Sequence, residues 1–211
     1  MTEPGEKPAK AERLVMFTDA VAAIALTLLI LPLLETIADA RAEHPQLGDL
    51  IGDNLGQFGA FALSFAVIFR FWWAHHRLFE HIETLNPVFV RLSTIWTFAI
   101  VVLPIPTAII TAYSASPGSV ALYGGTLALC SGALTAMAWY AHRHPEYSGN
   151  RPRESREMVL GNVTIFFAQV VATAVGSVFA DQIGFFAFLL MFLVGPVEGI
   201  VKARWRRESA L

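Results

Sequence analysis

The sequence predicts an all-α integral membrane protein with six transmembrane helices and both termini in the cytoplasm. Hydrophobic residues make up 55% of the 211 residues and charged residues only 15%, whereas soluble domains usually carry about 25% charged residues. Apolar runs recur along nearly the whole chain, and each is close to the roughly 20 residues that a helix needs to cross a bilayer. The basic residues also gather on one side of these runs, as they do in membrane proteins with a defined orientation.

Charged or Pro/Gly-containing breaks separate the six predicted spans. Residues 1–13 are polar and form a predicted cytoplasmic tail, and residues 202–211 form a basic cytoplasmic tail. Between them, residues 14–201 form one transmembrane domain. Pro104 and Pro106 predict a kink in the third span, because proline removes a backbone donor and clashes with the preceding turn. The spans cover about 14–34, 55–75, 88–112, 119–141, 158–180 and 182–201.

The positive-inside rule orients these spans, since Lys and Arg concentrate in cytoplasmic loops. Arg41 alone lies on the opposite side, in the loop 35–54, where five acidic residues accompany it. All other basic residues share one side: Lys7, Lys10, Arg13, Arg70, Arg77, Arg91, Arg143, Arg151, Arg153, Arg156, Lys202, Arg204, Arg206 and Arg207. This distribution predicts cytoplasmic termini.

The first span carries an acid and a stripe of large aliphatic residues on different faces. At about 100° per residue, Ile24, Leu28 and Leu31 fall on one line that continues to Glu35, and Asp19 points nearly the opposite way. A carboxylate within a span costs on the order of 2.5–3.5 kcal/mol, so it normally faces protein or water. One apolar face and one polar anchor are what a pore-lining helix requires.

Arg13, Thr18 and Asp19 allow two interpretations. In the simpler one, Thr18 or Asp19 caps backbone amides at the helix start and Arg13 extends to lipid headgroups. In the other, Asp19 joins a buried hydrogen-bond network with the second span and fixes the first helix in place. The favoured partners lie at the same cytoplasmic depth in the second span: Trp72, Trp73, His75 and His76.

Enzymatic activity is not predicted. The sequence contains no P-loop, no G-x-S-x-G, no H-E-x-x-H and no dinucleotide-binding fingerprint. It also lacks a TVGYG-like segment, from which ordinary potassium channels build a filter of backbone carbonyls. His76 and Glu80 have i,i+4 spacing, but adjacent histidines point about 100° apart and do not make a metal site. We predict no cofactor, no structural metal and no nucleic-acid partner.

Two motifs carry a resemblance to a known family. Arg13-x-x-x-Phe17-Thr18-Asp19 continues into an apolar run through Thr27 and Leu28, and W-W-A-H-H ends the second span. With both motifs the chain resembles the transmembrane-protein-175 family, the lysosomal potassium channels of animals and their bacterial and archaeal relatives. The usual family serine is Thr18 here, which keeps the hydroxyl. The resemblance implies a cation channel without a carbonyl filter. It also implies the prokaryotic form, a homotetramer in the cell membrane with four first helices around the pore.

The resemblance assigns roles to individual residues of the first helix. The family's hydrophobic bottleneck falls on Ile24, Leu28 and Leu31, and the adjacent Thr27 offers hydroxyls to a partly dehydrated ion. Arg13, Thr18 and Asp19 brace the helix. In a tetramer, Glu35 and Asp39 form rings of carboxylates that concentrate cations at the extracellular mouth. The expected protein is a potassium-preferring, weakly selective channel that contacts membrane lipid and holds potassium or other monovalent cations only in transit.

Other functions remain open from the sequence. The acids Asp19 and Glu198 favour a proton- or ion-coupled transporter or a proton-conducting channel. The lack of a visible inverted repeat or of paired broken helices disfavours a transporter. A non-conducting accessory membrane protein is the remaining alternative.

Overall fold

The computed structural model describes residues 6–40, 47–148 and 152–189, and within these ranges all regular structure is helical. The helix bounds in chain order are α1 Glu6–Leu28, α2 Leu31–Ala40, α3 Leu47–Asp53, α4 Leu55–Phe79, α5 Pro87–Val102, α6 Pro104–Ala112, α7 Pro117–Arg143, α8 Pro152–Val178, with 3₁₀ helices η1 Pro145–Tyr147 and η2 Gly184–Leu189.

Five stretches of the described residues are long and apolar enough to span a membrane, and they correspond to five of the six predicted spans. The sixth predicted span, 182–201, begins with η2 and otherwise lies outside the described residues. The five stretches are Ala11–Ala38, Leu55–Phe79, Pro87–Ala112, Pro117–Arg143 and Arg156–Val178.

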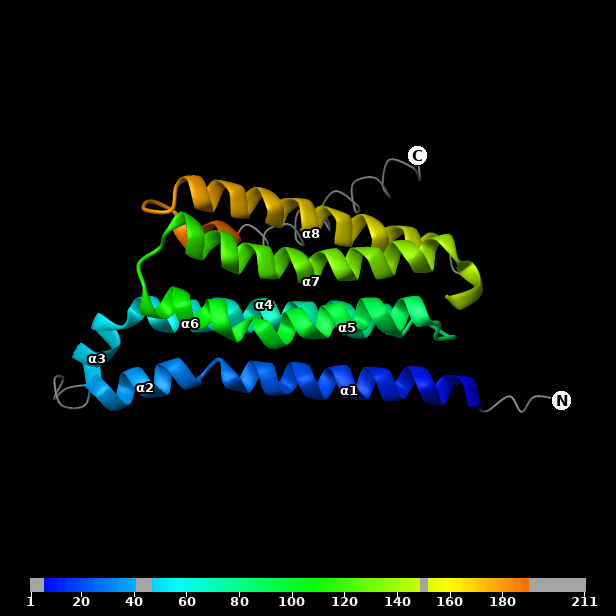
Figure 1. Ribbon diagram of the computed structural model, residues 1–211, viewed down its shortest axis with the longest axis horizontal. Coiled ribbons are helices and arrows are strands. Elements are labelled where there is room, and N and C mark those ends of the chain that lie inside the picture. Colours follow the sequence, from blue (N-terminus) through cyan, green and yellow to red (C-terminus); the bar gives the residue numbers. More distant parts are fainter. Residues whose placement is uncertain (1–5, 41–46, 149–151, 190–211) are drawn as a thin grey trace, which may run out of the picture.

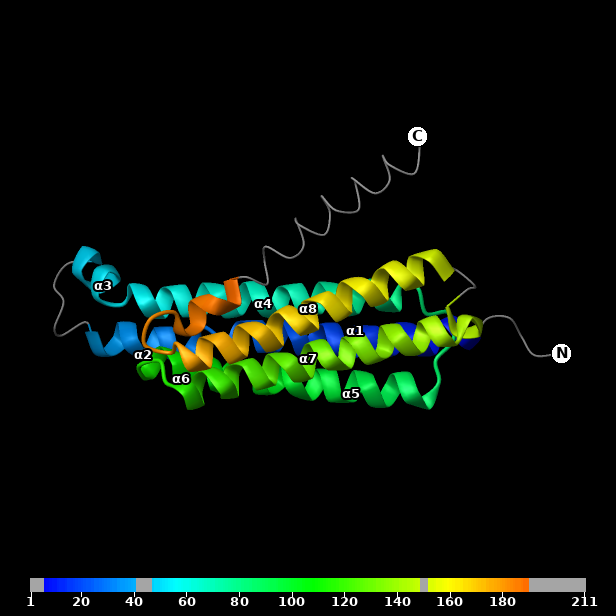
Figure 2. The same cartoon turned by 90° about the horizontal axis from the view of Figure 1, so that it is seen from above.

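The long helices run side by side along the longest axis of the molecule (Figures 1 and 2). α1 and α2 form one edge of the bundle, where α1 packs against α4 and α5. α7 packs against α5 on one side and most extensively against α8 on the other. The start of α1, the end of α4, the end of α7 and the start of α8 all lie at the same end of the bundle (Figure 1).

Proline interrupts two of the spans. The predicted kink in the third span is confirmed, because α5 ends at Val102 and α6 begins at Pro104. A second break, not anticipated from the sequence, separates α1 from α2 at Leu29 and Ile30. Pro32 has no amide hydrogen to donate to the carbonyl of Leu28, so the regular helical bond cannot form there. The turn is closed instead by the Ile30 amide, which donates to the Thr27 carbonyl at 3.3 Å.

The core lies between α4, α5 and α7 and combines large side chains with a few satisfied hydroxyls. Phe71, Trp96 and Leu127 are fully buried there. Deep in the bundle, the hydroxyls of Ser64 and Tyr123 lie 3.2 Å apart, and Thr107 donates to Ser64 at 3.1 Å. Because these buried hydroxyls partner one another, they add geometric specificity without leaving an unsatisfied polar group.

The close contact of α7 with α8 depends on Gly124. A Cβ built at Gly124 would lie 2.8 Å from the Cβ of Thr173 on α8, so the helices would have to separate. A Cβ at the neighbouring Gly125 would meet nothing within 4 Å. We expect Gly124→Ala to destabilise the protein by about 1–3 kcal/mol, the usual cost of overpacking. Gly125→Ala should be neutral or slightly stabilising, because alanine favours helix. Thermal unfolding in detergent measures both, and equal melting temperatures would contradict the role of Gly124.

Candidate functional site on the first helix

The two faces of the first span differ sharply in their surroundings. Ala22, Ala25 and Leu29 are buried and belong to the core of the bundle. The opposite face exposes Ile24 by 59%, Leu28 by 42% and Leu31 by 49%. Small alanines on the inner face let α1 approach its neighbours closely, and the large aliphatic residues are left pointing away from the subunit. The aliphatic stripe predicted from helical spacing is therefore an outward-facing surface.

Polar groups flank this stripe. Thr27 is exposed beside it, and its hydroxyl donates to the Ile24 carbonyl at 2.7 Å, which leaves the oxygen lone pairs available. Glu35 is exposed on α2, beyond the proline break. Asp39 also belongs to α2, but its side chain lies outside the described residues.

An apolar groove adjoins the stripe on the side of α6. It has a volume of about 520 Å³, and Leu28 and Leu31 line it together with Ile105 and Ile109. The two leucines therefore border their own subunit as well as the outside, whereas Ile24 does not line this groove.

Asp19 connects α1 to α4. The indole N–H of Trp72 donates to Oδ1 of Asp19 at 2.8 Å. Nδ1 of His76 lies 3.4 Å from Oδ2 of Asp19, which is an ion-pair distance when the imidazole is protonated. His76 also lies 3.9 Å, through Nε2, from Oε1 of Glu80. Thr18 is buried next to Asp19 and donates to the Val15 carbonyl within its own helix at 2.9 Å.

Trp73 and His75, also predicted near Asp19, make different contacts. His75 is buried, with Nε2 at 3.0 Å from the Ser93 hydroxyl and its ring stacked on Trp96 at a centroid distance of 4.1 Å. Trp73 is half exposed and its ring stacks with His76. Successive residues of a helix point about 100° apart, so residues 72 to 76 cannot all face one carboxylate.

Arg13 also lies apart from the contacts of Asp19. It is exposed, and together with Arg91 it lines a groove at the start of α5. The structure therefore brings together Asp19, Trp72 and His76 from the predicted set. Trp73 adjoins this group through its ring contacts with Trp72 and His76, and Arg13 and His75 make contacts elsewhere.

Sequence reasoning missed an acidic cavity beside this cluster. Asp19 and His76 line a cavity of about 710 Å³ together with Glu12, Glu80 and Glu83. The spacing of seven between Glu12 and Asp19 is a signal for one helical face, but the approach of the turn after α4 is a tertiary contact. Among the described side chains, no group of three or more His, Cys, Asp or Glu is arranged to hold a metal ion.

The amino-acid sequence of this chain is similar to those of known channel proteins. The sequence profile of the endosomal/lysosomal potassium channel TMEM175 matches residues 13–104, which include the aliphatic stripe of α1 and the contacts of Asp19 with α4. A potassium channel of Streptomyces collinus is 29% identical over 135 residues, covering 62% of this chain and 64% of that protein. The endosomal/lysosomal proton channel TMEM175 of Bos taurus is 36% identical over 94 residues, covering 42% of this chain and 20% of that protein. The chain thus spans less than two thirds of these relatives.

Solved structures share the fold over nearly the whole chain. A crystal structure of a lysosomal potassium-selective channel TMEM175 homolog from Chamaesiphon minutus superposes with a TM-score of 0.62 at 20% identity, covering 90% of this chain and 98% of that one. A crystal structure of a variant of the potassium channel MtTMEM175 gives a TM-score of 0.57 at 15% identity, covering 99% of this chain and 96% of that one. The chain is therefore similar to the TMEM175 channels, in sequence over residues 13–104 and in fold over most of its length.

Proposed function

We propose that this chain forms a potassium-preferring, weakly selective cation channel, in which the exposed face of α1 lines a pore at the centre of a homotetramer. The observation that carries the proposal is the exposure of Ile24, Leu28 and Leu31 on a helix whose opposite face is packed into the subunit. The position of α1 at the edge of the bundle supports it, because this helix can meet its symmetry copies without rearrangement (Figure 1).

The stripe acts as a hydrophobic gate in this proposal. Four copies of Ile24, Leu28 and Leu31 form three apolar layers, roughly 4.5–6 Å apart at 1.5 Å per residue. A narrow apolar ring blocks ions because water leaves it and nothing replaces the hydration shell. Potassium sheds water more easily than sodium, which gives a preference without carbonyl ligands. The break at Leu29 and Ile30 lies between two layers, so a hinge motion there widens the Leu31 layer.

Asp19 holds the pore helix in place in the same proposal. Its carboxylate takes a hydrogen bond from Trp72 on α4 and faces away from the stripe. A gate that opens by small movements needs a fixed point in the same helix, and this contact supplies one near the middle of α1. The role of Asp19 is therefore structural rather than conducting.

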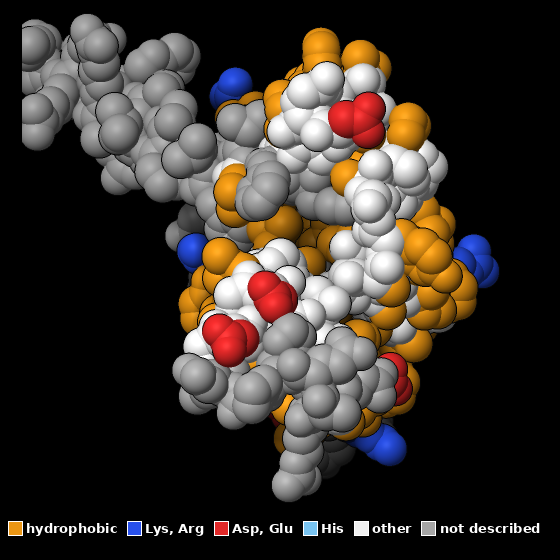
Figure 3. All heavy atoms as spheres, turned by 90° about the vertical axis from the view of Figure 1, so that its left-hand side faces the viewer, with side chains coloured by type: hydrophobic (Ala, Val, Ile, Leu, Met, Phe, Trp, Pro, Cys, Tyr) orange, Lys and Arg blue, Asp and Glu red, His pale blue; other side chains and the backbone are white. Residues whose placement is uncertain are grey.

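The charge at the two ends supports an orientation with both termini in the cytoplasm of a prokaryotic cell. Arg13, Arg77, Arg91, Arg143 and Arg156 lie at the end where α1 begins and α4 ends. Carboxylates face the viewer at the opposite end (Figure 3), where the chain places Glu35, Asp49, Asp53 and Asp181. By the positive-inside rule, the basic end is cytoplasmic. The acidic end then forms the outer mouth, in the plasma membrane.

A planar-bilayer recording of the purified protein tests the proposal. Under bi-ionic potassium and sodium gradients, we expect a cation current whose reversal potential favours potassium. A reversal potential that follows only an imposed pH gradient would instead support a proton-conducting channel, the activity named for the animal relatives. Flux that requires a proton gradient would support a coupled transporter, and the absence of any current would support a non-conducting accessory protein.

The outer mouth gives a prediction of its own. We expect Glu35→Gln to lower the inward conductance at low salt, because four fewer carboxylates concentrate fewer cations. The difference should fade near 1 M salt, where the Debye length falls to about 3 Å. Single-channel recording across a salt series measures this. The same substitution at Glu146, exposed in η1 near the opposite end, is the control. Equal effects of the two substitutions, or an effect independent of salt, would remove Glu35 from the mechanism.

A further inference from the structure

A second polar cavity lies between α4 and α8, away from the exposed face of α1. It has a volume of about 590 Å³, and its lining comes from the last part of α4 and the first part of α8. α8 lies on the opposite side of the bundle from α1 (Figure 1), so the cavity is separate from the proposed pore. Neither the gate nor the Asp19 contacts use its side chains, apart from the ring contact between Trp73 and His76.

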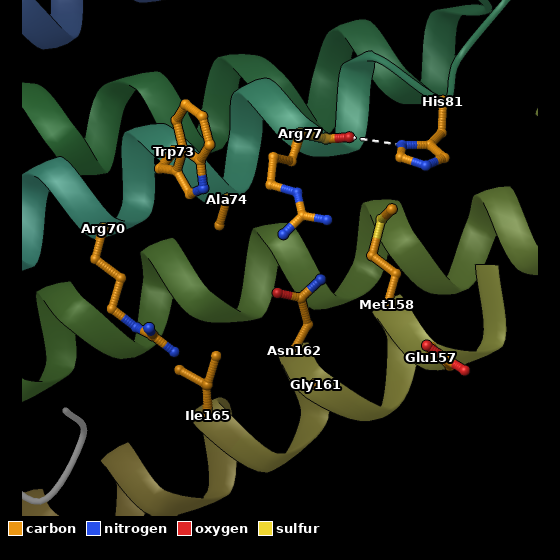
Figure 4. A pocket seen from close by; sticks show the side chains of 10 residues that line it. All are labelled: Arg70, Trp73, Ala74, Arg77, His81, Glu157, Met158, Gly161, Asn162 and Ile165. Carbon is orange, nitrogen blue, oxygen red and sulfur yellow. Dashed lines mark hydrogen bonds between the residues drawn. The ribbon is translucent and has the colours of Figure 1, made fainter. Parts of the chain in front are cut away.

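Two arginines of α4 supply the charge of this cavity. Arg70 and Arg77 are seven residues apart, so they share one face of the helix, about 10 Å apart along its axis. Figure 4 shows both guanidinium groups extending from α4 toward α8, with Arg77 directed at the side-chain amide of Asn162. Glu157 also lines the cavity, but its carboxylate points away from both guanidinium groups (Figure 4).

Small residues line the space between the two helices. Ala74 lies between the two arginines on α4, and Gly161 precedes Asn162 on the facing turn of α8. Neither residue has a side chain long enough to fill the gap. Both arginines line this cavity of about 590 Å³, which is large enough to admit a group of several non-hydrogen atoms.

The chemistry of the lining fits a phosphate at the membrane surface. A guanidinium fork matches two phosphate oxygens at once, and an amide such as Asn162 adds a further donor. Trp73 is half exposed at the cavity, and tryptophan favours the headgroup level of a bilayer. Met158 and Ile165 add apolar surface on α8 for the first part of an acyl chain. Basic pockets between transmembrane helices on the cytoplasmic side are typical sites for anionic headgroups.

We propose that this cavity binds the phosphate headgroup of an anionic phospholipid from the cytoplasmic leaflet, with Arg70 and Arg77 as the principal ligands and Asn162 and Trp73 as supporting contacts. The bound lipid bridges α4 and α8, and it stabilises the subunit against separation of these helices. The site does not depend on ion conduction, although its assignment to the cytoplasmic leaflet rests on the proposed orientation.

The test compares lipids by their effect on the melting temperature of the full chain in an uncharged detergent. Phosphatidylglycerol should raise the melting temperature above the value reached with phosphatidylcholine of the same acyl chains. The double variant Arg70→Gln, Arg77→Gln should lose this difference. Each basic residue near an anionic surface contributes roughly fivefold in affinity, so the apparent dissociation constant should weaken about 25-fold. Arg91→Gln, Arg143→Gln removes the same charge at the same end outside the cavity and should retain the effect.

Other outcomes are equally decisive. If millimolar inorganic phosphate alone reproduces the shift, the cavity is a free-anion site and the lipid assignment is wrong. If both double variants lose the shift equally, the attraction belongs to the whole basic end and not to this cavity. Should the Arg70 variant fail to fold, Arg77→Gln alone provides the test, because Arg77 is exposed. A phosphatidylglycerol shift unchanged in Arg77→Gln would then overturn the proposal. None of these readouts requires current, so they stand whether or not the protein conducts.

Discussion

Replacing Leu28 by alanine is expected to raise the sodium current relative to the potassium current and to increase the current at rest. The substitution removes four isobutyl groups from one layer of the proposed gate, so water can remain and sodium can pass with more of its hydration shell. We expect a change of about tenfold in the permeability ratio, which corresponds to only ~1.4 kcal/mol in relative barrier height. Bi-ionic reversal potentials in planar bilayers measure the ratio.

The control must share the exposure of Leu28 without lying on α1. Leu129 on α7 is 43% exposed against 42% for Leu28, so Leu129→Ala removes the same group from a similar surface. Leu29 is unsuitable despite its position next to Leu28, because it is only 2% exposed and its truncation would destabilise the core by about 2–5 kcal/mol. If Leu129→Ala shifts the ratio as Leu28→Ala does, the stripe faces lipid and not a pore.

Ile24→Asn should affect the same gate by a different route. An amide in the Ile24 layer offers hydrogen bonds to water and ions, so water no longer leaves this layer. Resting leak should rise even though the pore radius hardly changes. Leak in Leu28→Ala but not in Ile24→Asn would indicate that pore width, and not wetting, controls conduction.

Asp19→Asn is expected to lower stability and the yield of assembled protein more than it changes selectivity. The carboxylate accepts the Trp72 indole N–H at 2.8 Å and faces His76, and loss of a charged partner from such a contact costs on the order of 1–3 kcal/mol. Thermal unfolding and size-exclusion profiles in detergent measure both quantities.

Trp72 and Trp73 provide a matched pair for this test. Trp72→Phe removes the indole donor of the contact with Asp19 and should destabilise the protein. Trp73→Phe keeps an aromatic ring beside Trp72 and His76 and leaves that hydrogen bond in place, so it should destabilise less. In a double-mutant cycle, Asp19→Asn and Trp72→Phe should be non-additive because they share one contact. A stable assembly of Asp19→Asn with altered selectivity would show that Asp19 belongs to the conduction path.

Length and hydropathy were enough to predict five of the six spans, because crossing a bilayer needs one long apolar helix whatever its neighbours are. Five predicted spans correspond to helices, and Pro104 interrupts the third as its missing donor requires. The outward stripe of Ile24, Leu28 and Leu31 was likewise predictable, since helical geometry alone puts these residues on one face. Pro32 indicates a break in the first span just as Pro104 indicates one in the third. It was overlooked because the apolar run continues on both sides of it.

Tertiary structure alone decided which polar groups meet. Helical spacing places Trp72, Trp73, His75 and His76 at one depth, but only the packing of α4 between its neighbours turns Trp72 and His76 toward Asp19 and His75 toward Ser93. The cavity beside Arg70 and Arg77 likewise depends on tertiary structure, because Ala74 and Gly161 both line it and lie on helices more than 80 residues apart in the chain. The periodic spacing of residues determines which side chains share one face of a helix. The rotation of two helices and the distance between them depend on every side chain packed between them.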